Sequence, residues 1–336
     1  MARMLDRFAP LALLLFVLPL FAPLFVSDSY TLHFIWKILF WAALASAWNL
    51  AGGYAGQFSL GHAAFFGIGA YTSVLLYLKL GISPWLGMFV GGILAVGFAL
   101  LIGALTLRLR GAFFALATIA FAEVLRIAVV NLRDLTGGAE GLSVPFAPGL
   151  ANMMFSGRAG SVVLMAALLL VIALVTFAVE RSRLGYALAA LKEDEEAAEA
   201  LGVDTIRAKL ISIALSAFVS ALGGTAYAFY ILLIEPSTVL SIGMSVEMAL
   251  MAIIGGMGTV LGPAIGAILI VPLSEYLRAE FAGTFQGLYL LVYGAILILM
   301  VMFMPNGLMS VVRDPRGTMR RLKRRRRPAR GRNGDA

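Results

Sequence analysis

Acidic side chains crowd one short polar segment of the chain. Five of the seven residues at 193–199 are Asp or Glu, and Gly202, a favoured helix stop, follows them. Apolar residues recur around them at roughly helical spacing, at Leu188, Leu191, Ala198 and Leu201. A short helix over 188–202 with one apolar stripe needs a partner surface. Because its acids suit an anionic lipid surface poorly, we expect this helix to dock on a protein.

A second group of polar residues lies beside glycines in apolar surroundings and offers hydrogen bonds that a passing zwitterion could use. We take as candidate translocation residues Asn49, Gln57, Ser59, His62, Gly255 and Gly256. A lone histidine within a membrane is more often bonded to a neighbouring helix, so that interpretation of His62 stays open. Glycines equally serve close helix packing.

Charged residues inside apolar runs are few. Glu123 and Arg126 are three positions apart and share one helix face, so we expect an ion pair that faces the helix bundle and has a structural role. Glu247 is expected near the outer surface. These single charges do not form the chain of carboxylates that a proton relay needs.

The sequence lacks the residues that several kinds of site require. The chain has no cysteine and two histidines, which argues against a thiol or histidine-rich metal site. None of the five lysines follows a glycine, so there is no phosphate-binding Gly-x-x-x-x-Gly-Lys loop. No catalytic constellation stands out, and no cofactor is expected. If the chain transports actively, a partner binds the ATP.

The elements that position these residues are membrane spans. Hydrophobic residues make up 61% of the 336 and charged ones 13%, against about 45–50% and about 25% in soluble domains. Runs near the length of about 20 residues that a span needs predict an all-α, polytopic membrane bundle of about ten segments. The expected segments are 9–26, 31–51, 57–78, 84–107, 112–131, 161–180, 209–234, 244–256, 261–277 and 284–304.

Positive charge orients these spans. Ten crossings with both termini in the cytoplasm place most Lys and Arg residues inside and four outside, at Lys79, Arg133, Arg158 and Arg278. The transmembrane permease domain is then 1–308, with a cytoplasmic loop over 181–208. Residues 309–336 are expected to be a basic, disordered cytoplasmic tail that contacts lipid rather than nucleic acid. The glycines and Pro263 at 255–263 break an apolar stretch that is too long for one span; the two halves are two spans or a re-entrant hairpin.

The polar segment resembles a known docking element. Glu196-Ala197-Ala198-x-x-x-Gly202 is similar to the EAA motif of ABC-importer permeases, and the wider loop resembles the LivM-type permeases of branched-chain amino acid importers. Further similar stretches are 49–62, 110–118, 137–142, 254–259 and 305–308. The resemblance implies an inner-membrane translocation subunit rather than an enzyme. It also implies a sister LivH-like permease, two cytoplasmic ATPases and a periplasmic solute-binding protein. The coupling residues carried over are Glu193, Asp194, Glu196, Ala197, Ala198 and Gly202.

Other readings remain open at the level of sequence. An ion-coupled secondary transporter also has glycine-broken helices, although the acidic cytoplasmic helix argues against it. A membrane enzyme and a scaffold or sensor are further rivals. Within the importer family, urea, short amides and other small carboxylates are alternative substrates.

Overall fold

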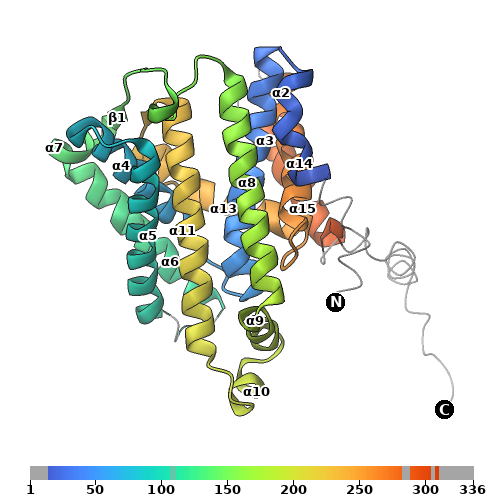
Figure 1. Ribbon diagram of the computed structural model, residues 1–336. Helices are drawn as coiled ribbons and strands as arrows, with labels where there is room; N and C mark the ends of the chain where they lie inside the picture. The colour runs from blue at the N-terminus through green and yellow to red at the C-terminus, as the bar shows by residue number, and fades with distance from the viewer. Residues whose placement is uncertain (1–13, 107–108, 110, 282–287, 304–306, 310–336) are drawn as a thin grey trace, which may run out of the picture.

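The chain folds into a bundle of long helices. The computed structural model describes residues 14–106, 109, 111–281, 288–303 and 307–309. The predicted all-α polytopic bundle is confirmed (Figure 1). The expected basic tail lies outside the described residues from position 310 onward.

The elements follow one another in this order: η1 Leu18–Phe21, α2 Ala22–Phe25, α3 Ser29–Asn49, the π-helical η2 Leu50–Tyr54, α4 His62–Leu80, α5 Pro84–Thr106, α6 Ala112–Asn131, α7 Arg133–Thr136, η3 Gly138–Glu140, β1 Leu142–Ser143, η4 Leu150–Asn152, α8 Arg158–Arg181, α9 Arg183–Glu193, α10 Glu195–Ala200, α11 Thr205–Ile231, β2 Leu233–Ile234, α12 Pro236–Val239, α13 Ile242–Gly255, α14 Gly262–Phe281 and α15 Leu288–Phe303. Strands β1 and β2 form one antiparallel pair, with Leu142 opposite Ile234.

Seven helical stretches of the described chain are long and apolar enough to cross a membrane. They are Ser29–Tyr54, His62–Leu80, Pro84–Thr106, Ala112–Asn131, Arg158–Arg181, Thr205–Ile231 and Pro236–Gly255. The first expected span is represented by the shorter apolar helix Leu14–Phe25. Helices α14 and α15 follow the seventh span, so the count of ten stays a prediction.

Several span boundaries differ from the expected ones, and two spans show why. The segment 57–78 becomes helical only at His62, because the Gln57 N–H donates to the Ala51 oxygen (3.0 Å) and Gly56 has a φ of +67°. The segment 209–234 begins earlier, at Thr205, and ends at Ile231, because Leu232 has a φ of +65° and the chain then enters β2. Gln57 and Ser59 therefore lie in non-helical chain.

The break predicted near residue 257 is confirmed as a separation of α13 from α14. The end of α3 lies at the same end of the bundle, because the Gly258 N–H donates to the Asn49 Oδ1 (2.8 Å). The two glycine-rich interruptions thus meet beside α9, and the start of α3 lies at the opposite end of the bundle (Figure 1).

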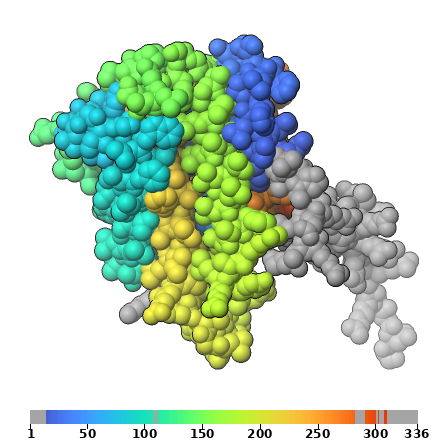
Figure 2. Space-filling model, in the orientation of Figure 1, coloured from blue at the N-terminus to red at the C-terminus, as the bar shows by residue number. Residues whose placement is uncertain are grey.

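Burial separates the inner helices from the peripheral ones. In the most apolar window of α3, 72% of the residues are buried, whereas in α6 only 17% are. Helix α11 packs against α4 and α5, while α3 packs against α8, α13 and α14. Helix α6 is therefore the least covered of the seven candidate spans. Figure 2 shows the outer surfaces of α8 and α11 and the projecting end formed by the segment between them.

Candidate coupling segment and translocation site

The acidic segment forms two helices, so the prediction of a single helix over 188–202 is wrong. Asp194 separates α9 from α10 with an extended backbone (φ −157°, ψ 113°). Its Oδ1 accepts hydrogen bonds from the N–H groups of Glu196 (3.0 Å) and Ala197 (3.1 Å). An aspartate at this position caps a new helix. The expected coupling residue Asp194 therefore also starts α10.

The apolar stripe of this segment packs on the chain's own bundle. Leu188, Leu191 and Ala198 are buried, and Leu188 contacts a cluster that includes Tyr54 and Ala208. Leu201, which we expected on the same stripe, is 84% exposed, because the break at Asp194 turns the last part of the segment away. What remains uncovered is an acidic surface with an apolar end.

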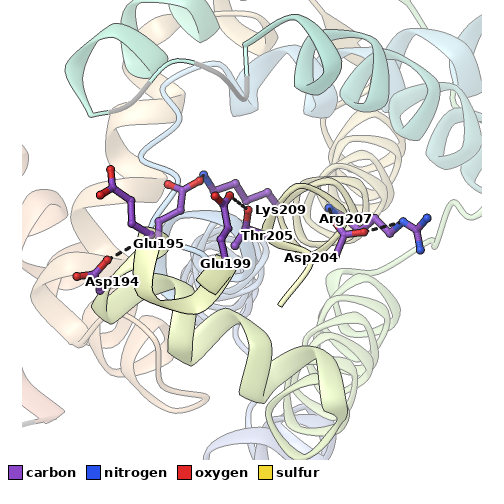
Figure 3. A network of polar contacts seen from close by, with 8 residues as sticks. Asp194, Glu195, Glu199, Asp204, Thr205, Arg207 and Lys209 are labelled. Atoms are coloured by element: carbon purple, nitrogen blue, oxygen red, sulfur yellow. Dashed lines mark hydrogen bonds and ion pairs between the residues drawn. The ribbon is translucent and has the colours of Figure 1, made fainter. Parts of the chain in front are cut away.

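Helix α10 is fixed to the start of α11 (Figure 3). Lys209 forms an ion pair with Glu195, and the Thr205 hydroxyl donates to the Glu199 carboxylate (2.5 Å). The Lys209 side chain is only 9% exposed, so this pair is largely shielded from water. Helix α10 and the start of α11 are therefore joined by two polar contacts.

Gly202 ends the segment as predicted. Its φ is +85°, a left-handed conformation that other residues adopt only at a cost, and its N–H donates to the Glu199 oxygen (2.9 Å). A Cβ added at Gly202 would meet no other atom within 4 Å. The residue is needed for the turn, and its surroundings leave room for a partner.

Lys192 connects α9 to the end of α3, a contact that the sequence did not predict. Its Nζ donates to the Gly53 oxygen (2.7 Å), and burial lowers the pKa of the Lys192 ammonium. Beside it, Asn49 binds the loop after α13 from both ends of its amide: Nδ2 donates to the Thr259 oxygen (3.0 Å), and Oδ1 accepts from Gly258. Helix α9, the end of α3 and the glycine loop therefore form one hydrogen-bonded unit.

His62 is fully buried, and both of its ring nitrogens are hydrogen-bonded. Nδ1 lies 3.1 Å from the Ser59 Oγ, and Nε2 lies 2.7 Å from the Ser216 Oγ. The Ser216 hydroxyl donates to the Ala47 oxygen (2.6 Å). These bonds tie α4 to α3 and α11. The Gln57 Oε1 is buried without a hydrogen-bond partner among the described residues, and Gln57 lines a cavity of about 180 Å³ together with Lys192.

Gly255 and Gly256 lie at a close backbone contact. A Cβ on Gly255 would stand 1.8 Å from the Gly262 oxygen, and a Cβ on Gly256 would stand 2.8 Å from the Met309 Cβ. Asn49, Gln57, Ser59 and His62 lie at the same end of the bundle as these glycines. The structure thus assigns the six candidate residues packing and hydrogen-bonding contacts, and a role for them in translocation stays a prediction.

The predicted pair of Glu123 and Arg126 is confirmed. The Arg126 Nε donates to the Glu123 Oε2 (2.9 Å), and a second bond joins the other nitrogen and oxygen atoms. The prediction that the pair faces the bundle is wrong, because the two side chains are 37% and 36% exposed. They project from α6, the peripheral helix.

A cavity of about 440 Å³ lies in the half of the bundle away from α9 and α10. Charged side chains from three helices line it: Lys37 from α3, Glu247 from α13 and Arg278 from α14. Lys37 forms an ion pair with Glu275 of α14. The sequence placed Lys37 inside a span and Glu247 near a surface, but no periodicity connected them.

The sequence of the chain is similar to those of known transport proteins. Residues 30–301 match the family model described as branched-chain amino acid transport system / permease component. The chain belongs to this family. The permease is 31% identical over 288 residues to the high-affinity branched-chain amino acid transport system permease protein LivM of Escherichia coli strain K12, and 30% identical to that of Salmonella typhimurium strain LT2.

The alignment with LivM covers 79% of this permease and 66% of the relative's length. The permease protein LivH of Escherichia coli strain K12 is 26% identical over 294 residues, which is 91% of LivH. No solved structure matches. The permease is thus a multi-pass membrane protein of a transport family that includes both LivM and LivH.

Proposed function

We propose that this chain is one of two membrane-spanning subunits of an ABC importer that moves branched-chain amino acids into the cytoplasm. Family membership supports the class of transporter. The observation that carries the mechanism is the pair α9–α10, which is anchored to the bundle by Leu188 and Lys209 and yet exposes Glu196 and Leu201. A fixed helix with an uncovered tip can both receive a push and transmit it.

In this proposal the loop 181–208, like both chain termini, lies in the cytoplasm, and two partner ATPases bind ATP and grip α10. Glu193, Asp194, Glu196, Ala197, Ala198 and Gly202 form or shape the gripped segment. Movement of α9 reaches the end of α3 through Lys192 and reaches the loop after α13 through Asn49. A periplasmic solute-binding protein docks at the opposite end, chiefly on 132–160. Coupling requires that the ATPases contact α10 differently in the two states of the bundle.

The glycine layer is the proposed inner gate. Asn49, Gln57, Ser59, His62, Gly255 and Gly256 lie where non-helical backbone meets the end of α3. Irregular backbone at membrane depth persists only beside protein or a water-filled cavity. A shift of α9 would exchange the hydrogen bonds of this layer and open a route to the cytoplasm.

The exposed face of α6 is proposed as the contact with a sister LivH-like permease. Glu123 and Arg126 lie near the middle of a 20-residue helix and are about one third exposed. Charge at that depth in lipid is costly, whereas a second helical subunit could cover the pair. Because the chain lacks cysteine, Val124→Cys provides a clean cross-linking position. We expect it to form a cross-link to the sister subunit in the assembled importer, and Leu101→Cys on α5 to form none.

Transport in reconstituted vesicles tests the whole proposal. The permease is combined with its sister subunit, the ATPases and the binding protein, and uptake of labelled leucine is measured. ATP on the side of the vesicle membrane where the ATPases lie is expected to drive uptake. Uptake driven by an ion gradient without ATP would indicate a secondary transporter, and uptake of urea or an amide but not leucine would reassign the substrate.

Replacing Lys192 by methionine is expected to weaken coupling. The variant keeps much of the side-chain volume but leaves the Gly53 oxygen without its donor, a loss of about 1–3 kcal/mol for a buried acceptor. Uptake per ATP hydrolysed should fall about tenfold, while hydrolysis persists. Lys79→Met is the matched control, because Lys79 also donates to a backbone oxygen, that of Asp134 (3.3 Å), at the other end of the bundle. Equal uptake by the two variants would contradict the role of Lys192.

A further inference from the structure

The cavity between α3, α13 and α14 contains charges that balance. Lys37, Arg278 and Glu247 line it, and the ion-pair partner of Lys37, Glu275, supplies a second carboxylate. Their sum is zero. A cavity of this kind best accepts a ligand that is itself neutral overall but carries both signs of charge, since an ion of one sign would leave one charge uncompensated.

Glu247 differs from the other three charged residues. Lys37 and Glu275 are already bound to each other, whereas Glu247 makes no hydrogen bond or ion pair with another residue that the structure describes. The cations that act on it electrostatically are Lys37 and Arg278. A carboxylate within a membrane span normally has a partner. A ligand ammonium group would supply one.

Aromatic and aliphatic side chains make up most of the rest of the wall. Trp36 stacks on Tyr230 with ring centroids 3.8 Å apart and on Phe40 at 5.1 Å. The His33 Nδ1 lies 2.6 Å from the Tyr230 hydroxyl, which helps to fix this group of rings. Met244 and Val271 complete an apolar surface beside the charges. Small-molecule sites commonly combine such walls with a few polar groups in a volume of about 300–1,000 Å³.

We propose that this cavity is a binding site for an α-amino acid zwitterion with an apolar side chain. Glu247 accepts the α-ammonium group, Lys37 and Arg278 face the α-carboxylate, and Trp36, Phe40 and Met244 contact the side chain. Glu275 positions Lys37. The site lies in the half of the bundle where a substrate released by a binding protein would enter, and in this respect it rests on the proposed function.

Protection of a cysteine in the cavity tests the site directly. Ser274 lines the cavity, and its hydroxyl donates only to the Val271 oxygen of its own helix (3.0 Å) among the described residues. Ser274→Cys therefore introduces one thiol with little change in volume. The rate at which a small water-soluble methanethiosulfonate labels this thiol is measured in the assembled, nucleotide-free importer, with increasing leucine, arginine, glutamate or urea.

We expect leucine to slow labelling at least about fivefold, and arginine, glutamate and urea to have little effect. Adding Glu247→Gln should raise the leucine concentration needed for half-protection about tenfold, because the ligand ammonium group would lose its hydrogen bond to a charged acceptor. The control is Glu280→Gln, which replaces an exposed carboxylate outside the lining of the cavity and should leave protection unchanged. If Glu247→Gln is not recovered in folded form, Glu247→Asp, which moves the carboxylate back by one methylene, should also shift the half-protecting concentration.

Two outcomes would overturn the site. Leucine could fail to protect Ser274→Cys although the importer takes up leucine, or the Glu247 variants could be protected as well as their parent. The first result would leave the importer function intact and reject only this cavity. An importer that takes up no amino acid at all would instead reject the function proposed above.

Discussion

Reversing the charge of Glu196 is expected to abolish most ATP-driven uptake while the protein remains inserted in the membrane. The side chain lies exposed on α10, in the first turn, where a negative charge favours the helix N-terminus. A lysine there would cost the helix only about 0.3–1 kcal/mol. Apposition of like charges across an interface costs several kcal/mol, so uptake of leucine in vesicles should fall by about 100-fold.

Two further variants separate docking from folding. Gly202→Leu places a side chain in open space but requires a φ of +85°, so it should also reduce uptake per ATP hydrolysed. Glu280→Lys reverses an exposed acid at the other end of the bundle and should change uptake less than twofold. Wild-type transport in both Glu196→Lys and Gly202→Leu would remove α10 from the coupling mechanism.

Replacing Gly255 by valine is expected to prevent recovery of the folded permease. A Cβ there would stand 1.8 Å from the Gly262 oxygen, 2.5 Å from its carbon and 2.9 Å from the Gly266 nitrogen. All three are backbone atoms, so no side chain can turn away. Overpacking usually costs about 1–3 kcal/mol, and a contact this close requires α13 and α14 to separate. Size-exclusion chromatography and thermal unfolding in detergent measure the loss.

Gly97→Ala is the matched control for this prediction. Gly97 lies within α5, and a Cβ on it would meet no atom within 4 Å. Alanine is favoured over glycine in a helix by about 1 kcal/mol, so this variant should unfold at the same temperature as the parent or a slightly higher one. If Gly255→Val unfolds at the same temperature as Gly97→Ala, the close α13–α14 contact does not exist.

The long spans could be predicted because a helix that crosses the lipid bilayer needs about 20 predominantly apolar residues. The expected segment 112–131 coincides with α6, and Pro263 with its neighbouring glycines correctly separated α13 from α14. Hydropathy reports such features directly. It does not report where polar backbone leaves a helix, which is why Gln57 and Ser59 were placed inside a span that begins at His62.

The errors in the candidate site have a common physical cause. Helical spacing placed Leu201 with Leu188, but Asp194 satisfies two N–H groups of a new helix and changes the direction of the chain. Aspartate is a common N-cap residue, so a helix start at Asp194 could have been predicted. The apolar spacing instead favoured one continuous helix. The pairing of Glu123 with Arg126 followed from spacing alone, but which face of α6 is covered depends on packing against the other helices.

The contacts missed altogether join residues that are distant along the chain. Lys192 binds Gly53, and the cavity brings Lys37 to Glu275 and Glu247. The periodicity of a single helix cannot predict these contacts, because they form where separate spans pack against each other. Only the presence of charge inside apolar runs marked these positions as unusual.

The side of the membrane on which α10 lies tests the account most directly. Leu201→Cys places a single thiol at a position that is 84% exposed in the parent. A membrane-impermeant maleimide should label it in inverted vesicles and not in intact cells with a permeabilised outer membrane, and bound ATPase subunits should slow the labelling. Labelling from outside in intact cells would contradict both the coupling role of α10 and the proposed importer.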